Sequence, residues 1–224
     1  MRRYLSALIL GAGGIAILVS LGVWQVRRLA WKEGIIAAIE AKIGDVPVTF
    51  ESLGKPDPVR DQYLPVTVTG RIGQDYLRVL SGRQFIGSGF RIISPLDTGT
   101  GIVLIDRGFV AEDEGPPPLH DEVVTVTGNL LWPQDADSYT PPPDLGKNIW
   151  FARDVPAMAA ALGTDPVLIV VRDGPNDTPI TPVPVDTASI PNDHRNYAIT
   201  WFSLAAVWAG MTGFLLWRIR QRTN

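Results

Sequence analysis

One stretch near the C-terminus decides the fold: Asn192-Asp193-His194-Arg195-Asn196-Tyr197-Ala198-Ile199-Thr200-Trp201-Phe202. An apolar run begins inside it, and no residue from 197 to 217 is charged at neutral pH. At about 1.5 Å per residue, a helix of that length spans roughly 30 Å, the thickness of a bilayer's hydrocarbon core. The run therefore predicts a transmembrane helix over residues 197–217. His194, one of only two histidines, lies just outside it.

A second charge-free run covers residues 4–24, and both runs have an aromatic residue at each end. Amphipathic rings of this kind settle at the headgroup level of a bilayer. The sequence thus predicts a first transmembrane helix over 4–24, a central domain over 25–196 and the second helix over 197–217. Helical spacing continues from Gln25, so the first helix is expected to run on to near Gly44. A cleaved signal peptide is disfavoured, because no small-x-small cleavage site directly follows Trp24.

Charge distribution gives the expected orientation. The two tails outside the runs carry five basic residues and no acid, whereas residues 25–196 carry the other 15 basic and all 23 acidic residues. Short basic tails stay in the cytoplasm. We therefore expect both termini to be cytoplasmic and the central domain periplasmic, in the inner (cytoplasmic) membrane of a bacterium. Arg27, Arg28 and Lys32 oppose this orientation, but two helices place both basic tails on one side.

Composition also excludes several classes of function. The acidic central domain gives no support for nucleic-acid binding. With no cysteine in the chain, disulfides, thiolate metal sites and cysteine nucleophiles are excluded. The short sequence before the first run offers no room for a mitochondrial transit peptide, which favours a bacterial origin.

The central domain reads as a series of short strands separated by turns. β-Branched and alternating segments predict strands, and one short helix is expected between the last two of them. The expected strands are 65–71, 76–80, 89–95, 101–108, 122–130, 148–152 and 166–171, and the helix is 155–162. Most connections have hairpin length, so the sheet should be mainly antiparallel and barrel-like. The predicted fold class is membrane α+β: two transmembrane helices flanking an extracytoplasmic β domain with a short helix.

His194, Tyr197 and Trp201 are spaced i, i+3, i+7 and share one face if the second helix extends a turn outward. A histidine with aromatic neighbours at a membrane edge suits haem iron, with the imidazole as ligand and the rings packing the macrocycle. The alternative is that His194 is an interfacial polar residue and the aromatic residues belong to a membrane belt. Spacing alone leaves both interpretations open.

The second helix also contains small residues at four-residue intervals, Ala206 with Gly210 and Ala209 with Gly213. Such pairs let helices approach closely, so this helix should contact protein, either the first helix or a second membrane protein.

Three other motifs in the central domain have a structural explanation. His120 lies beside two acids and is expected in a solvated loop rather than a metal site. Gly87-Ser88-Gly89 lacks the strand-to-helix context of a nucleophile elbow. Asp106-Arg107-Gly108 ends an expected strand and favours an ion pair or a turn.

Several motifs, in this order, resemble the Surfeit-locus family of cytochrome c oxidase assembly factors over almost the whole chain. The motifs are Leu21-Gly22-Val23-Trp24-Gln25-Val26-Arg27-Arg28 with Trp31-Lys32, Tyr63-Leu64-Pro65-Val66 with Gly70, Gly89-Phe90 leading to Ser94-Pro95-Leu96, Val103-Leu104-Ile105-Asp106-Arg107-Gly108-Phe109-Val110, and Asn192-x-His194-x-x-Tyr197-x-x-Thr200-Trp201. Asp106 stands where the family pattern has Asn. Phe90 and Phe109 stand where Tyr or Trp is common.

The resemblance implies a non-enzymatic role in maturing the haem-copper oxidase, at or near insertion of haem a into the catalytic subunit. It makes His194 the candidate ligand of the haem iron, with Tyr197, Trp201 and Trp24 as candidate haem-packing residues. The implied partners are the catalytic subunit, the haem a synthase as a further candidate, and the lipid bilayer. Two alternatives remain: a scaffold without a cofactor that stabilises an assembly intermediate, and an extracytoplasmic enzyme, for which the central domain offers only scattered acids and His120.

Overall fold

A computed structural model of the chain describes residues 2–83, 87–188 and 190–221, without the side chains of residues 2–4 and 83. Arg222 of the basic C-terminal tail lies outside the described residues. The elements in order are α1 (Arg2–Ile43), β1 (Val48–Thr49), the 3-10 helix η1 (Phe50–Leu53), β2 (Pro65–Ile72), β3 (Leu77–Arg83), β4 (Gly87–Asp97), β5 (Ile102–Ala111), β6 (Val123–Leu130), β7 (Ile149–Trp150), α2 (Val155–Leu162), β8 (Leu168–Asp173) and α3 (His194–Gln221). The chain divides into two units: Met1–Ala38 with Thr187–Asn224, and Ile39–Asp186.

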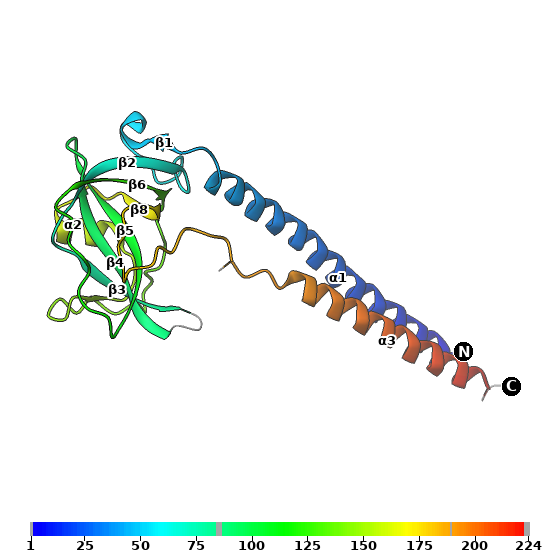
Figure 1. The fold of residues 1–224 in the computed structure, drawn as a ribbon. Helices are drawn as coiled ribbons and strands as arrows, with labels where there is room; N and C mark the ends of the chain where they lie inside the picture. The colour runs from blue at the N-terminus through cyan, green and yellow to red at the C-terminus, as the bar shows by residue number, and fades with distance from the viewer. Residues whose placement is uncertain (1, 84–86, 189, 222–224) are drawn as a thin grey trace. The chain divides into compact units, whose positions relative to one another are not determined.

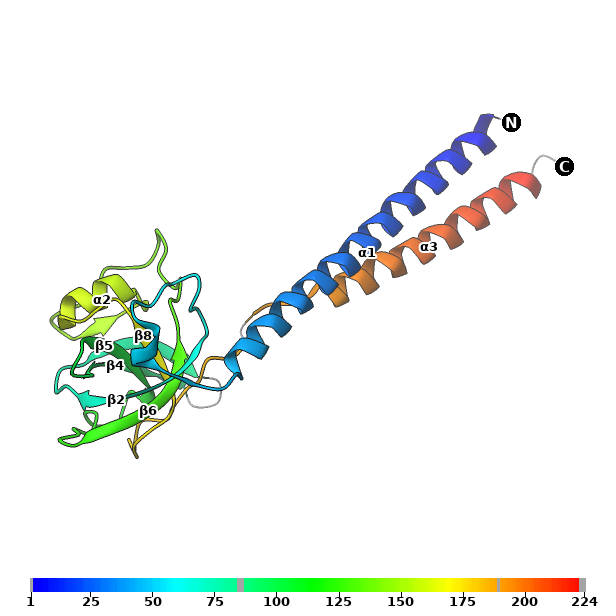
Figure 2. The ribbon, with the colours of Figure 1, turned by 90° about the horizontal axis from the view of Figure 1, so that it is seen from above.

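The first unit is a pair of antiparallel helices, α1 and α3, whose free ends lie at the same end of the pair (Figures 1 and 2). Both helices are long and apolar enough to cross a membrane. α1 has 42 residues, a length of about 63 Å, so the expected continuation of the first helix beyond Trp24 is confirmed. Most of its large apolar side chains are exposed, which a surrounding hydrocarbon phase would cover.

The second unit is built on an eight-stranded sheet in the order β1-β2-β6-β8-β5-β4-β3-β7. Most strand pairs are antiparallel, as expected, but β1–β2, β5–β8 and β3–β7 are parallel. A short additional pairing joins β2 to β4 through Arg71–Asp97 and Ile72–Leu96. This pairing makes the sheet ring-like, although it does not close into a regular barrel. The predicted fold is therefore confirmed as two long apolar helices flanking a mainly antiparallel sheet with a short helix, although the sheet is ring-like and not a barrel.

Two apolar clusters form the main core of this unit. One gathers side chains of β2, β6 and β8 around Val66 and Ile105, and the other packs α2 against β5 and β8 through Met158 and Leu104. α2 has the bounds that the sequence predicts. Asp154 caps its start by accepting from the Ala157 amide, and Gly163 ends it in the left-handed conformation.

β5 is buried along almost its whole length, so consecutive residues are covered on opposite faces of the sheet. Asp106 and Arg107 are both inside for this reason. Gly108 follows with φ +128°, and a Cβ there would lie 2.2 Å from the backbone oxygen of Thr181. A glycine is required at this position, because the backbone of Thr181 lies against it. Thr181 is held there by two backbone hydrogen bonds of 2.8 Å to Phe109.

Candidate functional site

The candidate site of the helix pair is built on a hydrogen bond between its two helices. α3 begins at His194, and the Nδ1 atom of that ring lies 2.8 Å from Oε1 of Gln25 on α1. An amide oxygen only accepts, so Nδ1 donates and the neutral ring carries its lone pair on Nε2. No described residue hydrogen-bonds to Nε2. The imidazole is thus held by one nitrogen and left free to bind through the other.

Close approach of the two helices brings this pair together. A Cβ at Gly11 would lie 2.1 Å from the Thr212 side chain, and one at Gly22 would lie 2.7 Å from the Phe202 ring. Glycines on α1 therefore accept bulky side chains of α3, as small residues do between membrane helices. The small-residue pairs expected on α3 do not take part in this contact, because a Cβ at Gly210 or Gly213 would meet no described atom within 4 Å.

The predicted aromatic residues lie near the same end of the helix pair. Because α3 begins at His194, the expected extension outward is present, and Tyr197 and Trp201 follow on the same face. Tyr197 and Trp24 are each 56% exposed, while Trp201 is half-buried. Trp24 directly precedes Gln25 on α1. Among the described residues, none of these three rings stacks on another aromatic ring.

Gln25 is the site residue that the sequence reasoning missed as a functional group. It belongs to the Trp24-Gln25 motif, but its role depends on a partner 169 positions away. The available signal was its position as the first polar residue after the apolar run. Its side chain is 8% exposed in the folded chain, so it forms a rigid support for the imidazole.

The residues present fit a haem group better than a bare metal ion. Histidines that bind metals almost always donate their other ring N–H to an acceptor, the role that Gln25 Oε1 plays for His194. In the described part of the chain, no three His, Asp or Glu side chains gather to hold a metal ion. A haem iron needs one or two axial ligands from the protein, because the macrocycle supplies the other four.

A buried cluster in the second unit corrects the expectation for His120. His120 lies in the loop before β6, as expected, but its side chain is only 15% exposed and its Nε2 lies 2.8 Å from Oδ1 of Asp177. Arg107 donates to both carboxylate oxygens of Asp177 and to the carbonyl of Pro118 at 2.7 Å. Burial raises the pKa of the Asp177 carboxyl, but the bonds from Arg107 and His120 outweigh it and hold that pKa below its usual value.

Asp106, on the opposite face of β5, forms a separate ion pair, as the sequence favoured. Its fully buried carboxylate accepts from Arg91 Nε at 2.6 Å and from the Gly108 amide at 3.2 Å. Arg153 reaches the same carboxylate at 3.9 Å while pairing with Asp135 at 2.6 Å. Both clusters tie β5 to the segments beside it, which makes them part of the framework of the second unit.

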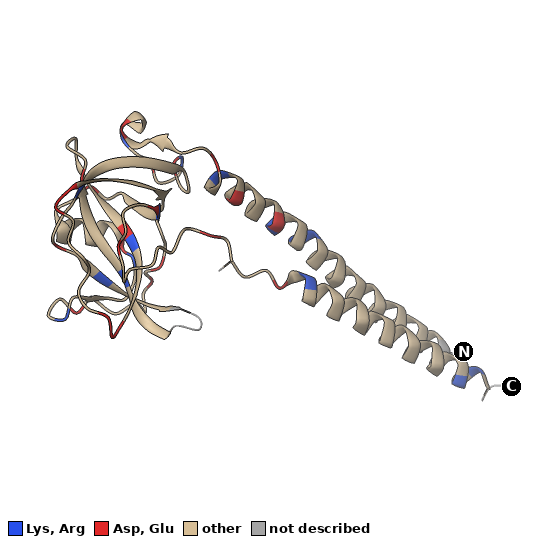
Figure 3. Ribbon diagram, viewed as in Figure 1, with Lys and Arg blue, Asp and Glu red and all other residues tan. Residues whose placement is uncertain are grey.

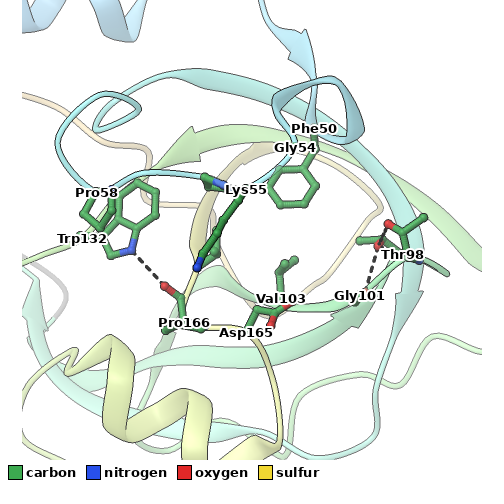
Figure 4. Close-up of a pocket in the computed structure, with 13 residues that line it drawn as sticks. Phe50, Gly54, Lys55, Pro58, Thr98, Gly101, Val103, Trp132, Asp165 and Pro166 are labelled. Carbon is green, nitrogen blue, oxygen red and sulfur yellow. Dashed lines mark hydrogen bonds between the residues drawn. The ribbon is translucent and has the colours of Figure 1, made fainter.

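The second unit also contains a cavity of about 620 Å³. Figure 4 shows the rings of Phe50 and Trp132 at its sides, with Lys55 between them and Asp165 near its floor. Trp132 donates to the carbonyl of Pro166 at 3.0 Å, which fixes that wall. None of the sequence-predicted site residues lines this cavity.

Comparison with known proteins identifies the family of this chain. The model of the SURF1 family matches residues 12–206. A SURF1-like protein of Drosophila melanogaster is 30% identical, covering 88% of this chain and 72% of the relative. Surfeit locus protein 1 of Xenopus tropicalis is 27% identical, over 84% of this chain and 68% of the relative. A SURF1-like protein of the bacterium Rickettsia bellii is 27% identical, over 85% of this chain and 82% of the relative. The chain therefore belongs to the SURF1 family, whose members are non-catalytic assembly factors.

Proposed function

We propose that this protein binds haem a through His194 and holds it for insertion into the catalytic subunit of cytochrome c oxidase. The SURF1 family acts in the assembly of this oxidase. The observation that carries the finer proposal is the hydrogen bond from His194 Nδ1 to Gln25, which leaves Nε2 as a free electron-pair donor. Haem a, when bound, supplies an iron that accepts this pair.

Each residue of the site has a distinct role in the proposal. Gln25 fixes the ring plane and the tautomer of His194, and a hydrogen-bonded imidazole is also a stronger ligand. The rings of Trp24, Tyr197 and Trp201 pack against the macrocycle and exclude water from it. The exposure of Trp24 and Tyr197 supports a transient site, because a ligand bound at an open face can pass to a partner protein.

The proposed location is the inner membrane of a bacterium, with residues 4–24 and 197–217 spanning it. Both termini are cytoplasmic and residues 25–196 form a periplasmic domain. The exposed apolar side chains of the helix pair, the basic tails and the bacterial relative support this arrangement. The proposed partners are the oxidase catalytic subunit, the haem a synthase and the lipid bilayer.

The test uses bacterial cells in which the oxidase becomes active only when this protein is supplied. The wild type and the His194→Ala variant are expressed at equal abundance, and the oxidase is purified from each. Haem a per catalytic subunit is expected to fall at least tenfold with His194→Ala while the subunit itself persists. An unchanged haem a content would contradict the proposal and favour the scaffold without a cofactor.

A further inference from the structure

Three basic residues follow the first apolar run on α1: Arg27, Arg28 and Lys32. Figure 3 shows the charged residues of α3 near its two ends, whereas those of α1 extend from its C-terminal end towards its middle. Within the described part of the chain, none of the three forms an ion pair. Basic residues at this end also oppose the expected orientation of the first helix. These cations, close to Gln25 in the sequence, could meet an anionic group bound at the candidate site.

Helix geometry separates these cations into two groups. Arg28 and Lys32 lie three and seven residues after Gln25, so they share its face of α1. That is the face which presents the Gln25 amide to His194. Arg27, two residues after Gln25, points to another side of the helix. At about 1.5 Å per residue, Arg28 and Lys32 stand roughly 4.5 and 10.5 Å beyond Gln25 along the axis.

The Arg28 side chain is held in a defined position. Its guanidinium carbon lies 3.9 Å from the centre of the Trp31 ring, a cation–π contact that orders the side chain at the flank of the face that Gln25 shares. The N–H groups at the guanidinium edge remain available for the two-point bond that arginine makes with a carboxylate. Lys32 is half-buried and adds a second charge on the same face.

We propose that Arg28 and Lys32 bind the carboxylate groups of the haem that His194 ligates. The inference rests on the proposed function and deepens it. His194 holds the iron, Gln25 holds His194, and the two cations farther along the same face hold the acidic edge of the macrocycle. Two separate attachments fix the orientation of the ligand, which a single axial bond leaves free to rotate.

The experiment compares two ligands on the full-length protein in detergent: haem with free carboxylates and its dimethyl ester. The Soret band reports binding to the wild type, to the double variant Arg28→Gln/Lys32→Gln, and to Arg27→Gln as the matched control. We expect the wild type and Arg27→Gln to bind free haem about tenfold more tightly than the ester, the effect of one to two charge-assisted bonds at a partly exposed site. The double variant should lose this preference and keep its affinity for the ester.

The outcomes separate the inference from the proposed function. If the wild type and the double variant prefer free haem over the ester equally, the inference is wrong but the proposal of haem binding stands. Absence of binding of either ligand to the wild type would overturn both. A third arm adds phosphatidylglycerol or phosphatidylcholine at a low molar ratio. If only the anionic lipid abolishes the preference, the cations hold lipid phosphate and the inference is wrong; an unchanged preference supports it.

Discussion

Replacing Gln25 with leucine removes the acceptor of the His194 Nδ1–H while keeping a side chain of similar volume. The lost bond is 2.8 Å long, and Gln25 is 8% exposed, so water cannot readily replace it. Losing such a support for a metal-binding histidine costs roughly 10- to 100-fold in affinity. That range corresponds to about 1.4–2.7 kcal/mol of binding free energy. We therefore expect Gln25→Leu to weaken haem binding by that factor.

The assay is a Soret titration of the full-length protein in detergent, with a check that its helix content is unchanged. Gln25→Glu keeps an acceptor opposite Nδ1 and should retain most of the affinity. Gln74→Leu, a change in an exposed turn of the second unit, should have no effect. The reasoning is refuted if Gln25→Leu binds haem as tightly as the wild type, because the imidazole would then need no support from α1.

The remaining predictions concern stability and packing. Asp177→Ala leaves the buried Arg107 without its main partner and should lower the free energy of unfolding by about 3–5 kcal/mol. Asp135→Ala removes a more exposed ion pair and should lower it by less than about 1 kcal/mol. Urea titrations that give equal losses for the two variants would refute this ranking. Because folding lowers the pKa of Asp177, its contribution is complete above the unfolded value of 3.8 and is lost as pH falls through the folded value. The difference in the free energy of unfolding between the wild type and Asp177→Ala should therefore become smaller below about pH 3.8. A difference that stays constant from pH 6 to pH 2 would contradict this. Gly14→Leu places a side chain where a Cβ already lies 2.4 Å from Trp208 Nε1, whereas a Cβ at Gly13 meets nothing within 4 Å. Spin labels on Leu5→Cys and Leu215→Cys should move apart in Gly14→Leu and stay in place in Gly13→Leu; equal distances in both would show that the helices do not pack through Gly14.

Local patterns predicted most of the fold, because each element carries its own signals. The helix over residues 155–162 is confirmed at both ends, since Asp154 and Gly163 act as caps through their own backbone neighbourhood. Strand 65–71 is likewise confirmed within one residue by its alternating β-branched side chains. In contrast, β1 was missed because its two residues, Val48 and Thr49, are strand only through parallel pairing with β2.

The parts of the candidate site that depend on contacts between distant positions could not be predicted from the sequence. His194 and its aromatic neighbours share one short motif, so their spacing was visible in the sequence. The role of Gln25 was not, because it arises from the antiparallel packing of α1 on α3. The loop around His120 was predicted, but the burial of its side chain was not, for the same reason: Asp177, its hydrogen-bond partner, is 57 residues away. Spacing along one element can be read locally, whereas a partner from another element depends on tertiary packing.

The most direct test of the central claim is an absorption spectrum of the full-length protein, purified from cells that also make haem a, beside its His194→Ala variant. The account predicts a Soret band in the wild type that is absent from the variant. Equal bands in both would place the ligand elsewhere. No band in either would contradict haem binding.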